Sequence, residues 1–221
     1  NNITNVSMLP DYAAICGITE NEILVQMKDD VDALAQKLEV TSEEVLAKLK
    51  ENYDGYHFTY PSPDIYNPFS LLNAFADGKF NSYWFGSGTP TYLIKMLDKF
   101  GVAPSEIGRK TAVAEDFDAP TERMVSITPL LYQSGYITIK DYDKELDLYT
   151  LDIPNKEVRI GLMKSLLPNY VASKTPETNT MVAYLSRDIR NGDMDAALHR
   201  LQEFLSTIPY CDNTRFEAHY Q

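Results

Sequence analysis

Apolar residues recur at helical spacing through the first fifty positions of the chain. Two consecutive stripes each fall on one face of a helix, the first at Val31, Leu34, Ala35 and Leu38 and the second at Val45, Leu46 and Leu49. Two capping boxes, Thr19 with Glu22 and Thr41 with Glu44, mark helix starts, because each pair satisfies backbone amides that a helix leaves free. This part of the chain therefore predicts helices that pack through one apolar face.

An aromatic stretch, ENYDGYHFTYPSPDIYNPFSLLNAF (residues 51–75), interrupts this pattern. It places four tyrosines around two prolines, a glycine and His57 before it becomes helical. Asn67 as a cap, with proline next, predicts a helix over 68–78 that a glycine ends. The same signals predict a second helix over 90–101, again between a proline and a glycine. The inner face expected for this second helix is Leu93, Ile94 and Leu97.

Beyond these helices the composition changes. Residues 102–120 lack strong periodicity and are expected to form a connector with one short strand. The stretch TERMVSITPLLYQSGYI is expected to form a helix that ends at Gly135, whereas alternation and β-branched residues predict strands in 136–140 (YITIK) and 146–154 (LDLYTLDIP). A further helix follows Asn155 as its cap. Helix, two-stranded wing and helix are the arrangement of a winged-helix unit, and a small α/β module with a shared core is the alternative.

The last fifty residues are expected to form a helical hairpin, which Gly192 breaks. The inner face expected for its second helix is Leu198, Leu201, Phe204 and Leu205. Together the patterns predict a mainly α fold with a small β wing. Its expected parts are a helical lid region in 1–104, a winged-helix-like unit in 105–172 and the hairpin in 173–221.

Composition and charge narrow the classes of function. The 221 residues carry 44% hydrophobic content and a net charge of -12, so a core is possible and a general surface for nucleic acid is disfavoured. Residues 121–170 hold six basic and seven acidic side chains, which argues against DNA binding by the wing. No apolar run is long enough for a membrane span, and no leader precedes the first helix, so a cytoplasmic location is expected. Cys16 and Cys211 require no disulfide, and the three histidines form no zinc pattern.

Catalytic motifs are absent from the sequence. It contains no G-x-x-x-x-G-K-[ST] loop, no G-x-S-x-G elbow and no H-E-x-x-H. His57 beside Asp54 is the best candidate for a catalytic histidine, but a loop histidine among aromatics is more often a structural hydrogen-bond partner. We therefore expect no catalytic residue, no metal ligand and no cofactor of its own in this chain.

Three motifs in close order carry a resemblance: YDGYHF (53–58), YNPFSLLNAF (66–75) and YWFGSGTPTYLI (83–94). With them the chain resembles the predicted AAA-ATPase-like proteins of gut bacteria and other anaerobes, which are largely uncharacterised. In that family a P-loop ATPase-like domain comes first, and a PD-(D/E)XK nuclease-like domain often follows. The resemblance covers the whole chain as the middle of that architecture. It implies that the chain is a fragment whose missing parts, the P-loop core and the nuclease-like domain, are its partners.

The resemblance also implies site residues. Gly88, Thr89 and Pro90 match the G-x-P element that begins the lid helix and packs near the nucleotide base, although a plain helix start explains the same residues. The tyrosine-rich stretch would fasten the lid to the ATPase core and line the base side of the nucleotide cleft. An aromatic mini-core is the favoured alternative for that stretch. ATP and magnesium are implied for the parent protein only. The residues implied on this side of the cleft are Tyr53, Asp54, Tyr56, His57 and Asn67.

Two functional hypotheses follow. In the first, the chain is a lid and winged-helix segment that couples the nucleotide state of the parent to an effector domain, without catalysis of its own. In the second, it is a non-enzymatic binding module for a protein, DNA or a small ligand such as a carbohydrate. Exposure of Tyr56, Tyr60 and Trp84 in one patch would support carbohydrate binding, because exposed rings form stacking platforms.

Overall fold

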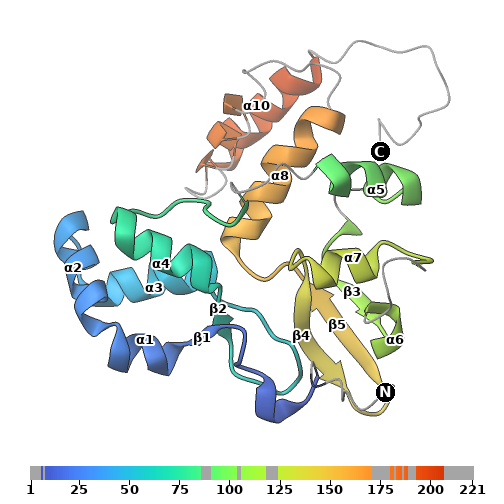
Figure 1. Cartoon of the computed structure of the whole chain (residues 1–221). Coiled ribbons are helices and arrows are strands. Elements are labelled where there is room, and N and C mark those ends of the chain that lie inside the picture. The colour runs from blue at the N-terminus through green and yellow to red at the C-terminus, as the bar shows by residue number, and fades with distance from the viewer. Residues whose placement is uncertain are drawn as a thin grey trace. The chain divides into compact units, whose positions relative to one another are not determined.

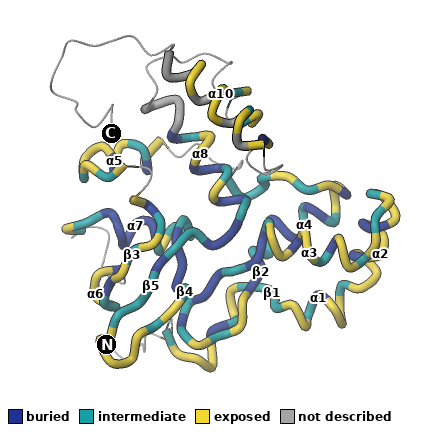
Figure 2. The backbone as a smooth tube through the Cα atoms, turned by 180° about the vertical axis from the view of Figure 1, so that it is seen from behind, coloured by how far each residue is buried: buried dark blue, intermediate teal, exposed yellow. Residues whose placement is uncertain are grey.

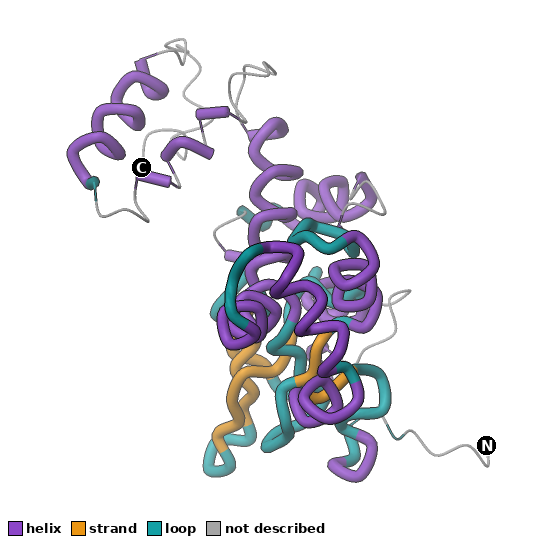
Figure 3. The backbone as a smooth tube through the Cα atoms, turned by 90° about the vertical axis from the view of Figure 1, so that its left-hand side faces the viewer, coloured by secondary structure: helices purple, strands orange, loops and turns teal. Residues whose placement is uncertain are grey.

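The protein was analysed as a computed structural model. It describes residues 6, 8–85, 91–103, 106–117, 124–170, 180–181, 183–185, 187–188 and 193–206. Contacts divide the chain into two compact units, Asn1–Met163 and Lys164–Gln221. Figure 3 shows that helices predominate over short strands, so the fold is mainly α with small β elements. Within the described residues, no helix is long and apolar enough to cross a membrane.

The first unit begins with a short 3-10 turn, η1 (Pro10–Tyr12), and three helices, α1 (Glu20–Gln26), α2 (Lys28–Leu38) and α3 (Ser42–Tyr53). Both predicted capping boxes are confirmed, at the start of α1 and at the start of α3. The apolar stripes turn inward as expected, because each helix buries one face and leaves its charged face in water. The fully or nearly buried members of this core include Ile23, Val31, Leu34, Ala35, Val45 and Leu49.

The next helix, α4 (Pro68–Asp77), begins and ends where the sequence predicts. The Asn67 side chain accepts a hydrogen bond from the Ser70 amide at 3.2 Å, and Gly78 ends the helix with a φ of 64°. The helix packs on the same core through Leu71 and Ala74. The following helix, α5 (Thr91–Phe100), buries Leu93 and Leu97 as predicted, and its expected opening at Pro90 lies outside the described residues.

A three-stranded antiparallel sheet forms the rest of the unit, with the order β3 (Lys110–Ala112), β5 (Leu148–Asp152), β4 (Thr138–Asp143). The predicted strands and the short strand in the connector are confirmed. Two short helices, α6 (Ala114–Phe117) and α7 (Thr128–Gln133), precede β4. The helix predicted to end at Gly135 begins later than expected, because Pro129 occupies the first turn of α7 and 124–127 is irregular. Figure 1 shows α1–α4 on one side of the β1–β2 pair and this sheet on the other.

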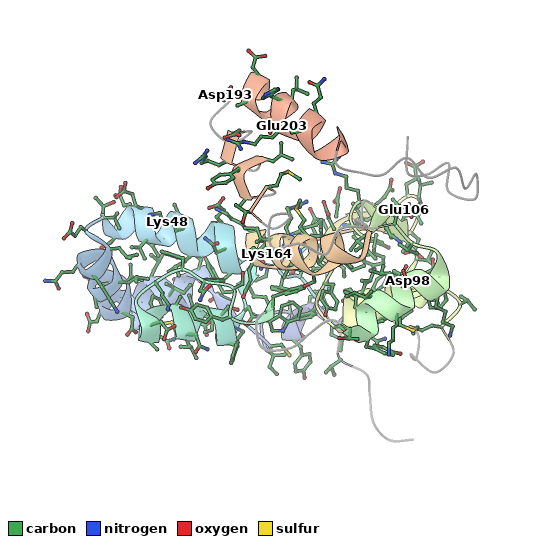
Figure 4. The ribbon with its side chains drawn as sticks, turned by 90° about the horizontal axis from the view of Figure 1, so that it is seen from above. Lys48, Asp98, Glu106, Lys164, Asp193 and Glu203 are labelled. Atoms are coloured by element: carbon green, nitrogen blue, oxygen red, sulfur yellow. The ribbon has the colours of Figure 1, made fainter. Side chains whose placement is uncertain are left out.

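Helix α8 (Lys156–Tyr170) begins after Asn155, whose side-chain oxygen accepts from the Val158 amide at 3.1 Å, so the predicted cap is confirmed. Charged side chains lie on the outer faces of the helices, as Figure 4 shows for Lys48 of α3 and Asp98 of α5. The protein interior of the first unit is therefore built from apolar, aromatic and a few hydrogen-bonded polar groups.

In the second unit, the described part contains α10 (Met194–Ser206) and helical residues between 180 and 188. Asp188 is buried and receives hydrogen bonds from Arg187 and Arg200, whose guanidinium carbons both lie 4.9 Å from the ring centre of Tyr184. The Arg200 hydrogen bond lowers the pKa of Asp188. Leu198, predicted on an inner face, is 58% exposed, and the expected break at Gly192 lies outside the described residues.

A close contact between α8 and the aromatic segment before α5 generates a prediction. A Cβ placed on Gly161 would lie 2.1 Å from Cγ of Phe85, so only glycine lets this ring approach the helix. Gly161→Ala should lower the free energy of unfolding by about 1–3 kcal/mol because of the clash with Phe85. This loss is expected even though alanine is better than glycine inside a helix by about 1 kcal/mol. Urea unfolding measures this difference. In a Phe85→Ala background the same substitution should become neutral or stabilising, and an equal loss in both backgrounds would contradict the contact.

Candidate functional site

The aromatic stretch between α3 and α4 forms a compact loop, here called the tyrosine loop (residues 53–67). It folds back on itself, because the backbone of Tyr56 pairs with that of Ile65 through hydrogen bonds of 3.3 and 3.2 Å. Its last strand, β2 (Ile65–Tyr66), then pairs with β1 (Ile18–Thr19). Figure 2 shows the buried backbone that runs through β2, and Ile65 and Tyr66 are each 1% exposed. The loop is therefore part of the interior.

The beginning of the loop is fastened to the helical core. Tyr53 is fully buried, and its hydroxyl donates to the Asn81 carbonyl at 2.9 Å and accepts from the Asn81 amide at 3.0 Å. Burial raises the pKa of Tyr53 to about 12, so this hydroxyl stays protonated. The Tyr53 ring lies next to Phe80 and Tyr83.

The other side of the loop is bound by side chains of the sheet. The Lys140 ammonium group donates to the carbonyl oxygens of Gly55, at 2.5 Å, and Pro154, at 3.2 Å. Thr138 Oγ1 accepts from the His57 amide and donates to the His57 carbonyl, both at 2.8 Å. Asn155 Nδ2 donates to the Asp54 carbonyl at 3.0 Å. Three side chains thus satisfy four buried or half-buried backbone groups of the loop, an arrangement called here the loop clamp (Thr138, Lys140 and Asn155).

The position of Gly55 follows from the clamp. Its φ is 92°, a conformation that side chains disfavour. A Cβ at Gly55 would lie 2.6 Å from the Pro154 oxygen and 2.9 Å from the Lys140 nitrogen. Burial lowers the pKa of Lys140, and nearby Asp64, Asp152 and Asp54 oppose that shift. The clamp therefore combines close backbone approach with a partly desolvated positive charge.

Asp54 is a buried acid of the loop with one carboxylate oxygen left without a hydrogen-bond partner among the described residues. Its side chain is 3% exposed, and its Oδ1 has no hydrogen-bond partner within the described residues. Burial raises the pKa of Asp54 to about 6, against a smaller opposing effect of the Gly55 amide. An ionised carboxylate here costs free energy, since a buried charge needs a partner for each oxygen.

His57 lies between a serine and an aspartate, but the arrangement is not a nucleophilic triad. Its Nε2 lies 2.6 Å from Asp64 Oδ1, and its Nδ1 lies 2.9 Å from Ser62 Oγ. The Ser62 hydroxyl also donates to the Thr59 carbonyl at 2.9 Å. The hydroxyl proton is therefore engaged by a backbone acceptor, and His57 cannot take it as a base in this geometry. The geometry assigns His57 to holding the tip of the loop closed.

A second anchor fixes the aromatic segment 83–85. Glu157 accepts from Ser70 Oγ at 2.6 Å through Oε2 and from the Trp84 amide at 2.8 Å through Oε1. Burial raises the pKa of Glu157, and the hydrogen bonds from Ser70 and the backbone amides of 83–85 oppose the rise. The Trp84 and Phe85 rings then pack edge-on against Tyr136, with centres 5.5 and 6.0 Å away.

A pocket of about 230 Å³ lies beside the tyrosine loop. The loop and β2 form one wall, the turn after α7 forms another, and Trp84 closes the space between them. No charged side chain takes part in the lining. The lining residues are Cys16, Tyr56, Phe58, Ile65, Tyr66, Asn67, Pro68, Trp84, Tyr132, Gln133, Ser134, Gly135, Ile137 and Thr138.

The structure brings together five of the eight residues implied by the resemblance. Tyr53, Asp54, Tyr56, His57 and Asn67 all belong to the tyrosine loop, and Tyr56 and Asn67 line the pocket. The other three, Gly88, Thr89 and Pro90, lie outside the described residues. Tyr56 is 8% exposed, and Tyr60 and Trp84 are half-buried, so the exposed aromatic platform of the carbohydrate hypothesis does not form.

Sequence reasoning missed the partners of the loop. Lys140 entered only as a positive charge, Asn155 only as a helix cap, and Glu157 only as a negative charge. Thr138 and Lys140 both belong to β4, but the register against β5 shifts between Ile139 and Asp141, so strand alternation in the sequence does not pair the two side chains.

The described residues contain no cluster of several ligands for the implied magnesium ion. No group of three or more His, Cys, Asp or Glu side chains lies close enough together to hold a metal in the part of the chain that the structure describes. A phosphate-binding glycine loop is absent from the sequence.

Replacing Lys140 tests the clamp. Lys140→Met keeps much of the aliphatic stem but leaves the Gly55 and Pro154 carbonyls without their shared donor, so the free energy of unfolding should fall by about 2 kcal/mol. The matched control is Lys144→Met in the exposed turn between β4 and β5, which should change stability by less than about 0.5 kcal/mol. Chemical denaturation of both variants gives the comparison. Equal stabilities would contradict a clamp centred on Lys140.

The raised pKa of Asp54 predicts a pH dependence with a defined sign. Because the pKa of Asp54 is about 6 in the folded protein against an ordinary value of 3.8, its ionisation costs stability as pH rises through 6, and this cost disappears below 3.8. Asp54→Asn removes this cost. The difference in free energy of unfolding between Asp54→Asn and wild type should therefore shift in favour of the variant by about 1–2 kcal/mol from pH 5 to pH 8. A difference between the two proteins that does not change with pH would show that Asp54 is not buried as an acid.

Comparison with known proteins gives one uncharacterised relative. No family model matches the chain, and no solved structure matches it. The chain is 30% identical over 233 aligned residues to a protein of Azotobacter chroococcum mcd 1 described as "Uncharacterized protein in vnfD 5'region". The alignment covers 100% of this chain and 42% of that protein, so the chain spans less than half the length of this relative. The likeness therefore extends over the whole chain described above but assigns it no activity.

Proposed function

We propose that this chain is the lid and winged-helix segment of an AAA-ATPase-like protein, and that it couples the nucleotide state of that protein to an effector domain without catalysing a reaction itself. The observation that carries the proposal is the loop clamp, in which Thr138, Lys140 and Asn155 bind the backbone of the tyrosine loop. A segment that transmits motion has to move as one body. The clamp bonds the tyrosine loop, which continues from the helical part, to the sheet, and so favours movement of the two together.

The strand order supports the winged-helix part of the proposal. In a winged-helix unit the first strand pairs with the third, and the second strand pairs with the third from the other side. Here β3 comes first, α6 and α7 follow, and β5 lies between β3 and β4. Helix α5 before β3 would be the first helix of such a unit. This order is a closer fit than the helix, wing and helix arrangement that the sequence alone indicated.

The tyrosine loop supports a mechanical rather than a catalytic role. Its histidine is held between Ser62 and Asp64, and the hydroxyls of Tyr53 and Tyr56 bond to backbone carbonyls. The motif YDGYHF thus supplies structure at Tyr53, Gly55, Tyr56 and His57. In the parent, this rigid loop would carry movements of the lid to the winged-helix unit.

DNA binding by the winged-helix unit is the rival function. The strand ends and turn of the wing, KDYDKELD (140–147), carry four acidic and two basic residues, and phosphate contacts come from Lys and Arg. The acidic wing therefore favours contact with protein over contact with DNA. A salt-sensitive shift of duplex DNA at low micromolar protein would support the rival instead.

The experiment is a measurement of the native protein. An antibody against the chain, applied to an extract of the source cells, should detect a protein much larger than 221 residues, and the protein recovered with the antibody should hydrolyse ATP. The isolated 221-residue chain should show no hydrolysis, because it has no phosphate-binding loop. A native protein of 221 residues, or ATP hydrolysis by the isolated chain, would contradict the proposal.

A further inference from the structure

The lid proposal assigns no role to the aromatic pocket beside the tyrosine loop. Five of its lining residues are aromatic, namely Tyr56, Phe58, Tyr66, Trp84 and Tyr132. We propose that it binds an uncharged, planar aromatic molecule of one or two rings. The proposal stands on the pocket alone and does not depend on the ATPase-like assignment.

The side chains of Thr138, Asn67 and Tyr56 in the wall already have hydrogen-bond partners within the protein, and this disfavours polar ligands. Thr138 Oγ1 both accepts from and donates to His57, and Asn67 Oδ1 caps α4. The Tyr56 hydroxyl donates to the Gly135 carbonyl at 3.3 Å and also bonds to the side chains of Asn67 and Asn155. A sugar in this space would leave its hydroxyl groups without partners, at a cost for each of them. The pocket therefore favours a ring over a carbohydrate.

The absence of charged lining residues also disfavours charged ligands. None of the fourteen lining residues is Asp, Glu, Lys, Arg or His, and burial raises the pKa of the Tyr56 and Tyr66 hydroxyls, which stay neutral. An ion entering the pocket would lose its water without gaining a counter-charge. An uncharged aromatic group instead exchanges water for contacts with ring faces and edges.

The size of the pocket fits a small ring system. Its volume of about 230 Å³ lies below the roughly 300–1,000 Å³ of sites for drug-sized ligands, so one or two fused rings are the suitable occupant. The walls are held in place before any ligand arrives. Gly135, with a φ of 73°, turns the chain between the Tyr56 and Trp84 rings, and its Cβ position lies 3.6 Å from the first and 3.7 Å from the second. A preformed pocket loses little entropy on binding.

The mouth of the pocket lies at its exposed lining residues, Cys16 and Gln133. This position allows an accessibility assay at Cys16 and a control substitution next to it. The thiol of Cys16 reports occupancy, because a bound molecule blocks the approach of an alkylating reagent. The neighbouring Ile15 is 72% exposed and is not part of the lining, so it offers a matched control for substitutions at the mouth.

The test uses the full 221-residue chain and 5-fluoroindole, whose binding is followed by the line width of its fluorine NMR signal. Binding is expected at a ligand concentration on the order of 0.1–1 mM, as for a good fragment of about ten heavy atoms. Cys16→Phe should fill the mouth and weaken binding at least about tenfold, a typical effect of blocking a small apolar site. Ile15→Phe should leave binding unchanged. In a Cys211→Ser background, the ligand should also slow alkylation of Cys16 by N-ethylmaleimide.

Fluorocyclohexane and fluoroglucose are the comparison ligands. The proposal predicts weaker binding of fluorocyclohexane, which lacks a π-system, and no binding of fluoroglucose. It is overturned if 5-fluoroindole does not bind at about ten times the expected concentration, if Cys16→Phe and Ile15→Phe have equal effects, or if the sugar binds as well as the ring. Binding of a tryptophan-containing peptide in place of free 5-fluoroindole would also overturn it and assign the pocket to a protein partner.

Discussion

The ammonium group of Lys140 is the contact on which the arrangement of the first unit depends. It stands between the carbonyls of Gly55 and Pro154, and so joins the tyrosine loop to the end of β5. Backbone carbonyls in an interior need donors, and the loop has few of its own. Because Gly55 has no side chain, the lysine can come this close to the loop. Thr138 and Asn155 then complete the hydrogen bonds on either side.

This dependence explains why the tyrosines are numerous. A loop that runs through an interior has to bury both backbone and side chains, and tyrosine supplies a large apolar ring with one hydroxyl that can meet a backbone group. Tyr53 uses its hydroxyl on Asn81, and Tyr56 uses its hydroxyl on Gly135. The same packing leaves the pocket, since rings fixed from both sides cannot collapse into the remaining space. The clamp and the pocket thus have one physical origin.

Local signals predicted local structure well. The capping boxes at Thr19 and Thr41 and the caps at Asn67 and Asn155 all lie where the sequence indicated, because each depends on residues within a few positions. The helix predicted to end at Gly135 begins later than expected for a local reason as well, since Pro129 sets the first turn of α7. The clamp could not be found in this way. Lys140 lies 85 residues from Gly55 in the sequence, and no local pattern around either residue indicates that the two are in contact.

The central claim is that the clamp makes the helical part and the sheet one cooperative body. Native-state hydrogen exchange tests this most directly, by comparing the free energy of opening for amides in α2–α3 with that for amides in β4–β5. The account predicts that the slowest amides of both regions open with the same free energy and lose it together as denaturant is added. If the sheet opens at a clearly lower free energy while α2 and α3 stay protected, the two regions are independent and the claim is contradicted.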